Sequence, residues 1–292
     1  MNISIICPLY NGESFLEKLH YSLINQENVE IASIDYRMTE GKDNTEEILQ
    51  KLNCNYRKIK AKEFSHSITR EEAAFEATGD ILVFITQDII IKDNRWLYNL
   101  VRPIEEGSCV ASFSRQICDN DTLEKYTREN NYPKESKLKS KADIEELGIK
   151  TFFFSDASSS IRRDIFLEIN GYDNKRLLTN EDMYIAHKII MAGYKIRYSA
   201  ESWVIHSHKF TLKQLYKRYY DTGVFLGEHN YLLDYKANKA ATGLLGYVVR
   251  RAIEEKNYRA LASVIPNFGA RYLGNFFGKN KGKRLGKSRG IK

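Results

Sequence analysis

The sequence contains few of the residues that mark fibrous, low-complexity or disulfide-linked chains. Among its 292 residues only four are proline, four are cysteine and seventeen are glycine. The cysteines form no CxxC pair and show no spacing typical of zinc ligands, so we expect reduced thiols that pack as small apolar side chains. With 42% hydrophobic and 28% charged residues, the chain is expected to fold around one large core.

Long apolar runs are also missing. Residues 1–13 contain no basic segment followed by an apolar stretch, so we expect no signal peptide. The most apolar stretch elsewhere, at 81–91, is too short to span a membrane and is interrupted by Gln87 and Asp88. We therefore expect the chain to be made and kept in the cytoplasm.

Positive charge is concentrated at the C-terminal end. The formal net charge is +7, and residues 278–292 contain seven Lys or Arg and no acid. This segment follows a stretch rich in aromatic and apolar residues, a combination that suits the surface of an anionic membrane. A tail that is merely solvated is the alternative. Because the sequence has no helix-turn-helix, zinc or RNP signature, we expect no nucleic acid partner.

Apolar runs alternate with helical patterns of about ten residues in the N-terminal third. The runs at 2–7, 29–35, 55–61 and 80–86 predict strands, which implies βαβ units, an α/β fold and a mostly parallel sheet. Ligands of such sheets bind at the carboxyl ends of the strands. The residues found at those positions are Pro8, Tyr10, Asn11, Asp35, Thr86, Gln87 and Asp88.

The rest of the chain predicts a second half of the same domain and a helical end. Residues 1–118 and residues 119–210 are expected to form the two halves of one domain. Within the second half, residues 119–150 are charged and loosely patterned, which predicts a mobile insertion that contains helix. Residues 211–292 are predicted to be a basic region, helical to about residue 277, that associates with membranes.

Seven motifs occur in a fixed order along the chain. They are PLYNG at 8–12, Asp35 with DNT at 43–45, FSHSITREEAAFEATGDILVFITQD at 64–88, SDASSSIRRDIF at 155–166, NGYD at 170–173, NED at 180–182 and VIHSHKFT at 204–211. This set resembles family 2 glycosyltransferases, and most closely their bacterial rhamnosyltransferase branch. The resemblance covers residues 2–225 and implies a GT-A (Rossmann-like) catalytic domain that binds a nucleotide sugar. Residues 1–118 would then be its donor half and residues 119–210 its acceptor half.

The resemblance implies a divalent metal, Mn²⁺ or Mg²⁺, that neutralises the leaving diphosphate. Asp88 takes the place of the last acid in the DxD-like motif of such enzymes and is expected to bind the metal. His206 is the preferred second ligand, and His208 is either a ligand or a contact of the diphosphate. Side chains two apart on a strand point the same way, so both can face one site. Taken without these motifs, Asp88 would be interpreted as a loop or helix-cap carboxylate.

The resemblance also assigns the base of the reaction. An inverting transferase needs a group that removes the proton of the acceptor hydroxyl as its oxygen attacks. Asp182 is expected to be this base, with Glu181 orienting the acceptor or the sugar. The alternative is that two acids simply stabilise the N-terminus of the helix that Asn180 opens.

Further residues are expected to hold the donor. Asp35 is expected to accept the N–H of uracil or thymine, and Arg70 to pair with the diphosphate, for which a guanidinium is suited. Glu71 departs from the family pattern, because a carboxylate beside a diphosphate-binding arginine is unfavourable. Pro8, Tyr10, Asn11 and Gln87 complete the expected nucleotide-sugar contacts.

The acceptor side of the site is expected to include Asp156, Ser158 and Tyr220. Asp156 and Ser158 would form a wall between the donor sugar and the acceptor; a small-residue strand packed on a helix is the equal alternative. Tyr220 would stack on a sugar ring, although aromatic helix faces more often belong to the core.

The resulting prediction is an inverting glycosyltransferase that moves L-rhamnose from dTDP-rhamnose to a hydroxyl of a lipid-linked saccharide. It would serve cell-surface polysaccharide synthesis, bound peripherally at the inner face of the plasma membrane. The first alternative is the same fold with a UDP-sugar donor, carrying GlcNAc, Glc or Gal, because a sugar pocket is set by shape and few hydrogen bonds. The second is a non-catalytic nucleotide-sugar-binding protein.

Overall fold

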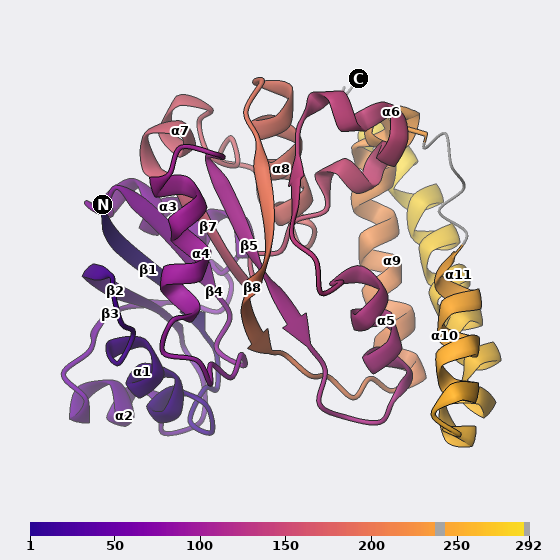
Figure 1. Cartoon of the computed structure of the whole chain (residues 1–292), viewed down its shortest axis with the longest axis horizontal. Helices are drawn as coiled ribbons and strands as arrows, with labels where there is room; N and C mark the ends of the chain where they lie inside the picture. Colours follow the sequence, from indigo (N-terminus) through magenta and orange to yellow (C-terminus); the bar gives the residue numbers. More distant parts are fainter. Residues whose placement is uncertain (237–242, 289–292) are drawn as a thin grey trace.

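An eight-stranded mixed sheet forms the centre of the protein (Figure 1). The computed structural model describes residues 1–236 and 243–288, so the last four residues of the predicted basic tail lie outside the described residues. The strand order is β3-β2-β1-β4-β7-β5-β8-β6. The strands are β1 (Asn2–Leu9), β2 (Glu30–Thr39), β3 (Asn55–Ile59), β4 (Ile81–Ile85), β5 (Ala111–Ile117), β6 (Lys137–Lys139), β7 (Ser158–Arg162) and β8 (Ile196–Ile205).

The sheet is mostly parallel, which confirms the predicted α/β class. β7 runs antiparallel to both β4 and β5, and β6 runs antiparallel to β8; the other neighbours are parallel. The helices are α1 (Leu16–Ile24), α2 (Thr45–Lys51), α3 (His66–Glu76), α4 (Trp96–Glu105), α5 (Leu123–Asn131), α6 (Ile144–Leu147), α7 (Arg163–Glu168), α8 (Glu181–Met191), α9 (Leu212–Glu228), α10 (Gly243–Glu254) and α11 (Tyr258–Ser288), with 3₁₀ turns η1 (Lys141–Asp143), η2 (Gly148–Phe152) and η3 (Asn230–Asp234).

The apolar runs form strands because both faces of the sheet are covered by helices. In β4, Leu82 and Phe84 point into the core shared with α3, α7 and α8, whereas Val83 and Ile85 point into the core shared with α1 and α4. All five residues of β4 are buried. A strand that is apolar on both faces reads as a continuous hydrophobic run, which is how the sequence presents it.

The second strand is longer than predicted. β2 continues to Thr39, so the prediction that Asp35 ends this strand is wrong. The reason is a long-range pairing, because residues 35–39 remain hydrogen-bonded to all of β3. Thr39 therefore occupies the carboxyl end of β2.

Residues 119–150 belong to the sheet and its surroundings. They include α5, whose Tyr126 is fully buried, and β6, which pairs with β8 at the edge of the sheet. The segment thus adds both an edge strand and a wall of the cavity described below, in place of a separate insertion.

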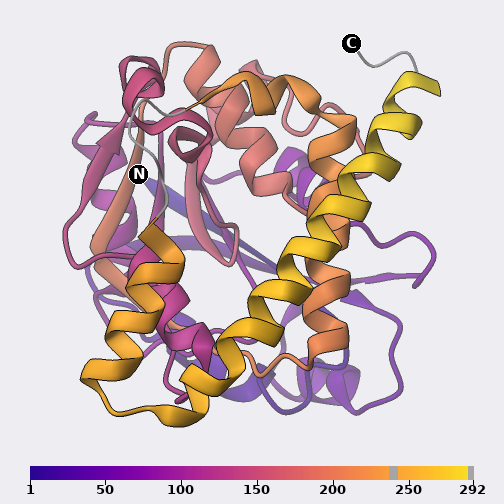
Figure 2. The same cartoon turned by 90° about the vertical axis from the view of Figure 1, so that its right-hand side faces the viewer.

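The helices after residue 210 pack on one another and on α5. α9 and α11 cross side by side (Figure 2), and α11 continues beyond the predicted end near residue 277 to Ser288. α10 and the start of α11 share a small core with α5 that contains Tyr126, Val248 and Val264. A domain boundary near residue 210 stays a prediction. None of the described helices combines the length and apolarity needed to cross a membrane.

Glycines bring the backbones of α9 and α11 into contact. A Cβ atom on Gly223 of α9 would lie 2.5 Å from the carbonyl oxygen of Asn275, and one on Gly278 of α11 would collide with the carbonyl oxygen of Tyr220. Gly274 and Gly282 of α11 lie against α9 in the same way. The face of α11 that packs on α9 is therefore made of glycine, and its bulky side chains lie on other faces.

Candidate active site

A cavity of about 730 Å³ lies at the carboxyl ends of β1, β2 and β4 and extends to α5, α8, α9 and α11. It brings together most of the residues predicted from the sequence, although they come from distant segments. The predicted residues that line it are Pro8, Tyr10, Arg70, Gln87, Asp88, Asp156, Glu181, Asp182, His206 and His208.

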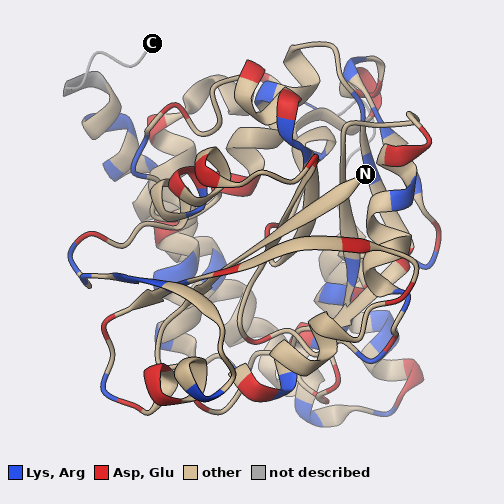
Figure 3. Cartoon of the chain, turned by 90° about the vertical axis from the view of Figure 1, so that its left-hand side faces the viewer, with Lys and Arg blue, Asp and Glu red and all other residues tan. Residues whose placement is uncertain are grey.

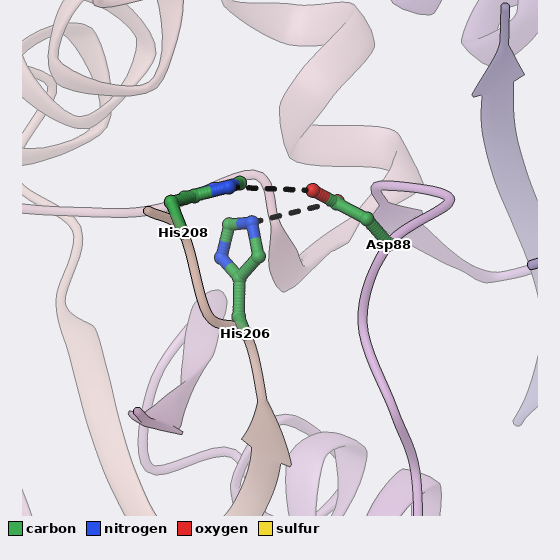
Figure 4. A group of neighbouring side chains, drawn as sticks. All are labelled: Asp88, His206 and His208. Carbon is green, nitrogen blue, oxygen red and sulfur yellow. Dashed lines mark ion pairs between the residues drawn. The ribbon is translucent and has the colours of Figure 1, made fainter. Parts of the chain in front are cut away.

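Asp88, His206 and His208 form a group in the cavity that is able to hold a metal ion (Figure 4). One carboxylate oxygen of Asp88 lies 3.4 Å from His206 Nε2, and the other lies 3.8 Å from His208 Nδ1. The three ligand atoms lie within 4.8 Å of one another. One carboxylate and two imidazoles at this separation fit a divalent cation, and the nitrogen donors suit Mn²⁺ better than Mg²⁺.

Backbone pairing sets this geometry. Asp88 lies in the turn after β4, and two residues later Ile90 exchanges two hydrogen bonds with Ile205 at the end of β8, at 2.8 and 3.0 Å. The amide of the next residue, His206, donates to the carbonyl of Ile117 at the end of β5. The turn that carries Asp88 is thereby fastened to the strand end that carries the histidines.

The protonation states of the three groups suit a metal. Burial lowers the pKa of His208 to about 4, with a further contribution from nearby His206, and burial also lowers the pKa of His206. Both imidazoles are therefore neutral at pH 7. Burial is the largest influence on Asp88 and opposes its ionisation, but the neighbouring His206, Thr86 and His208 together outweigh burial and hold the pKa of this carboxyl well below its ordinary value.

Gln116 orients His206. Its Oε1 atom lies 2.9 Å from His206 Nδ1 and also accepts a hydrogen bond from Arg128, while its Nε2 donates to Ser155 at 2.8 Å. A carbonyl oxygen held in this way requires a proton on Nδ1, which leaves the Nε2 lone pair for a ligand. Sequence reasoning missed Gln116, because a glutamine within a strand carries no signal of such a role.

Three carboxyl groups also gather in this cavity, at Asp156 and at the first two residues of α8. Glu181 forms an ion pair with Arg70, whose guanidinium donates a hydrogen bond to Glu181 Oε1 at 2.9 Å. Asp156 accepts from the hydroxyls of Tyr172 and Ser159, both at 2.7 Å. Burial, together with the negative charges of Glu181 and Asp156, raises the pKa of Asp182 well above its ordinary value. Asp182 thus holds a proton more tightly than an exposed carboxyl does.

The helix that carries Asp182 begins as predicted, but without the predicted cap. Asn180 occupies the N-cap position with a left-handed φ of 59°, and its side chain makes no capping hydrogen bond. Its Oδ1 atom has no hydrogen-bond partner within the described structure and borders the cavity.

Arg70 lies deeper than its predicted role requires. It is 1% exposed, and Glu181 and the carbonyl of Asp156 are its acceptors on the cavity side. The expected conflict with the neighbouring Glu71 does not arise. The Glu71 carboxylate points the other way and accepts the backbone N–H groups of Tyr172 and Asn174, at 2.5 and 3.0 Å.

The residues of the PLYNG motif form a braced turn at one end of the cavity. Gln87 donates to the carbonyl of Tyr10 at 2.9 Å and accepts from its amide at 2.8 Å. Asn11 accepts from the amide of Lys42 at 3.0 Å, so it holds the loop after β2 and does not line the cavity. Asp43 of the DNT motif fastens the same loop by accepting from the Glu13 amide at 2.9 Å.

Besides Asn11, three predicted residues are not brought to the cavity. Asp35 lines a smaller cavity of about 470 Å³, where Arg37 donates to it at 2.9 Å. Ser158 is fully buried in the sheet, between Ser114 and Trp96, so the small-residue packing alternative describes it. The backbone of Tyr220 packs against Gly274 and Gly278 of α11 and its ring stacks on Tyr216, whereas its neighbour Tyr219 lines the cavity.

Three arginines that the sequence did not single out also line the cavity: Arg128 of α5, Arg218 of α9 and Arg271 of α11. Arg271 donates to Tyr219 and Thr127, and Arg128 is paired with Glu124. Among the described ion pairs none involves Arg218, whose guanidinium stacks over Phe210 at 5.5 Å. The positive charge of Arg218 lies near His206 and His208, because it contributes to the lowered pKa of both histidines.

A mostly parallel α/β sheet whose cavity holds a carboxylate–imidazole group and a cluster of buried carboxyls is the arrangement expected of a glycosyltransferase. The family model of Glycosyl transferase family 2 matches residues 4–169. The chain therefore belongs to glycosyl transferase family 2 and is a glycosyltransferase. It is 37% identical to the O-antigen chain rhamnosyltransferase RfbN of Salmonella typhimurium over 229 residues, which cover 77% of this chain and 72% of that protein. It is 36% identical to WbaN of Salmonella anatum, an O-antigen chain rhamnosyltransferase, with the same shares covered.

Solved structures share the fold at low sequence identity. The mannosyltransferase PcManGT of Pyrobaculum calidifontis, in complex with GDP-Man and Mn²⁺, matches with a TM-score of 0.63 and 14% identity, covering 96% of this chain and 86% of that one. Residues 1–349 of TarS from S. aureus, in complex with UDP-GlcNAc, match with a TM-score of 0.56 and 12% identity, covering 99% and 91%. The predicted GT-A fold is thus confirmed.

Proposed function

We propose that this glycosyltransferase is an inverting enzyme that transfers L-rhamnose from dTDP-rhamnose to a hydroxyl of a lipid-linked saccharide in O-antigen synthesis. The observation that carries the mechanism is the meeting, in one cavity, of the Asp88–His206–His208 group with Asp182. The choice of rhamnose is supported by the two Salmonella relatives, which are rhamnosyltransferases by name.

The reaction needs a base on one side of the donor sugar and positive charge on the other. Asp182 removes the proton of the acceptor hydroxyl while its oxygen attacks the anomeric carbon, and the bond to the diphosphate oxygen breaks. The raised pKa of Asp182 makes it a stronger base than an exposed carboxylate. Glu181 is held by Arg70 and keeps the start of α8, and hence Asp182, in place.

The leaving diphosphate is assigned to the opposite wall. Asp88, His206 and His208 would hold a divalent ion, for which the two nitrogen ligands favour Mn²⁺, and such an ion stabilises the charge that develops on the diphosphate. Arg218 has no carboxylate partner among the described residues, and its guanidinium stacks on Phe210. It is therefore free to bind a phosphate by donating hydrogen bonds to it. Pro8 and Tyr10 line the same end and are assigned to the donor.

A lipid-linked acceptor places the enzyme at the inner face of the plasma membrane, bound peripherally. Residues of α5, α9 and α11 line one part of the cavity, and we assign the acceptor to this part, beside the C-terminal helices. Arg128, Tyr219 and Arg271 line this part of the cavity and offer hydrogen-bond donors and an aromatic ring to a saccharide.

A screen of donor hydrolysis tests this function. The purified chain is given dTDP-rhamnose, UDP-GlcNAc, UDP-Glc or UDP-Gal with Mn²⁺, Mg²⁺ or EDTA, and the released nucleotide diphosphate is measured. We expect turnover of dTDP-rhamnose that requires a metal and falls by at least about 100-fold in Asp88→Asn. Asp164→Asn is the matched control, because Asp164 pairs with Arg162 at the surface, away from the cavity.

The other outcomes of the screen are equally informative. Turnover of a UDP-sugar in place of dTDP-rhamnose would retain the mechanism and overturn the rhamnose assignment. If no donor is turned over, even with a lipid-linked acceptor present, while dTDP binds, the chain is a non-catalytic nucleotide-sugar-binding protein.

A further inference from the structure

The solvent-facing side of α11 is unusually apolar. Ile265 is 84% exposed, Tyr272 is 68% exposed and Phe276 is 48% exposed. These three residues are spaced by seven and four positions, so they lie on one face of the helix. Neighbouring exposed residues extend this face, and they are Tyr258, Leu273 and Phe277. We call these six residues the outer stripe.

The packing of α11 explains why the outer stripe is left in solvent. The opposite face of the helix meets α9 through glycine, at Gly274, Gly278 and Gly282. At these glycines the two helices are too close for a side chain, so the large side chains of this part of α11 cannot be buried against α9. Figure 2 shows α11 running across the front of the molecule with α9 behind it, which leaves the outer stripe without a cover from the described chain.

Cations continue the same face toward the C-terminus. Lys283 lies seven positions after Phe276 and therefore below it on the helix, and Lys281 and Arg284 flank it; all three are exposed. α11 contains no Asp or Glu along its whole length, from Tyr258 to Ser288. By contrast, acidic and basic residues are interspersed over the side of the molecule that carries β2 and β3 (Figure 3).

We propose that the outer stripe together with Lys281, Lys283 and Arg284 docks α11 flat on an anionic lipid bilayer. Aromatic and aliphatic side chains enter the region between headgroups and acyl chains, and the lysines and arginine bind lipid phosphates. A second copy of this chain fits this surface less well, because an acid-free helix offers no carboxylate to the cations of its partner.

The docked helix is also a wall of the active-site cavity. Arg271 lines the cavity and is 6% exposed, while the next residue, Tyr272, faces outward. A bilayer against the outer stripe therefore lies one helix away from the acceptor side of the cavity. This inference deepens the proposed function and rests on it in one respect: docking on a bilayer is useful to the enzyme because its proposed acceptor is carried by a lipid.

Vesicle flotation with the full chain tests the surface. Vesicles of phosphatidylcholine, with or without phosphatidylglycerol, are mixed with the wild type, with Tyr272→Ser/Phe276→Ser, or with Lys281→Gln/Lys283→Gln/Arg284→Gln. Tyr21→Ser/Ile24→Ser on α1 is the matched control, because Tyr21 and Ile24 are 48% and 50% exposed at the other end of the molecule.

We expect the wild type and the control to bind vesicles that contain phosphatidylglycerol. Each lost cation is worth a factor of about five at such a surface, so the triple variant should bind roughly 100-fold more weakly. The serine variant should bind about tenfold more weakly or worse, because its two rings no longer enter the bilayer.

Hydrolysis of the donor in solution, without lipid, is measured on the same proteins. Loss of vesicle binding with unchanged hydrolysis supports the inference. Vesicle binding without any donor turnover, even after a lipid-linked acceptor is added, would contradict the proposed function and leave this surface assigned. Equal vesicle binding by the wild type and both variants would overturn the inference. Light scattering completes the test: if the serine variant turns a dimer into a monomer, and vesicle binding is unchanged, the outer stripe is an interface between copies.

Discussion

Gln116 Oε1 lies 2.9 Å from His206 Nδ1, on the side of the imidazole that faces away from Asp88. The same oxygen accepts a hydrogen bond from Arg128. If the Gln116 amide were flipped, its nitrogen would take this place, and a nitrogen that only donates could make neither contact. The tautomer of His206, and with it the lone pair offered to a metal, is thus set by a residue that never touches the metal itself.

This relationship predicts the effect of Gln116→Leu. Loss of the acceptor should weaken Mn²⁺ binding by about 10- to 100-fold, because His206 loses its orientation. Titration of the metal, followed by the electron paramagnetic resonance of free Mn²⁺, measures the affinity directly. Gln50→Leu on α2 is the control, since Gln50 is exposed and hydrogen-bonded only to Tyr56 at the surface. Unchanged affinity in Gln116→Leu would show that the strand alone positions His206.

Asp182 predicts an unusual combination of lost activity and gained stability. Burial and the charges of Glu181 and Asp156 raise its pKa in the folded chain. The folded state therefore binds the proton more tightly than the unfolded state, and stability falls as pH rises through the raised pKa. Asp182→Asn should lower the rate of transfer by a factor of about 10² to 10⁴. It should also stabilise the protein at pH values above the raised pKa of Asp182, but not at pH values below the range in which ordinary carboxyls titrate.

Urea unfolding at acidic and alkaline pH measures this effect, and Asp173→Asn provides a control of opposite sign. Burial opposes ionisation of Asp173, but hydrogen bonds from Lys188 and Tyr184 lower its pKa, so its contribution to stability is present at neutral pH and lost in acid. If Asp182→Asn is destabilising at alkaline pH, the carboxyl is ionised there without cost and its assignment as a strong base fails.

Arg218 is expected to act on the diphosphate and not on the fold. Arg218→Ala should weaken binding of dTDP by about tenfold or more, because one charge-assisted contact to phosphate is lost, with little change in unfolding free energy. Isothermal titration with dTDP and with thymidine separates the two parts of the ligand. Thymidine binding should be unaffected. Arg250→Ala is the control, because Arg250 lies on α10 and does not line the cavity. A matching loss of thymidine binding would assign Arg218 to the nucleoside.

Two glycines of α11 should respond oppositely to alanine. A Cβ atom on Gly278 would collide with the Tyr220 carbonyl, so Gly278→Ala should cost about 1–3 kcal/mol by forcing α9 and α11 apart. Gly269 has no atom within 4 Å of the added Cβ, so Gly269→Ala should stabilise the helix by about 0.5–1 kcal/mol. Denaturant unfolding measures both. Equal effects of the two substitutions would show that the close contact between α9 and α11 does not form in solution.

Much of the fold was predictable because its signals are local. The alternation of apolar strands and short helices predicts the parallel part of the sheet, and the carboxyl-end rule correctly places Asp88 and Tyr10 at the cavity. The position of Asp35 could not be predicted in this way, because the length of β2 depends on its pairing with β3.

Other features of the site depend on which face a helix or strand presents. Tyr219 lines the cavity and Tyr220 does not, because the glycines of α11 pack against the backbone at Tyr220. Arg271 reaches the cavity from the last helix, in a segment whose sequence resembles a basic, solvent-exposed tail. Such contacts between distant segments leave no periodic pattern in the sequence.

The buried ion pair of Arg70 and Glu181 has a consequence for how this enzyme can diverge. The two residues lie 111 positions apart, and loss of either would leave an uncompensated charge in the interior at about 3–5 kcal/mol. That is a large share of the stability of a typical domain. A mutation at one position is therefore tolerated only when the other position also changes. Descendants of this gene should carry both residues or neither, so a residue of helix α3 limits which residues can occupy the start of α8.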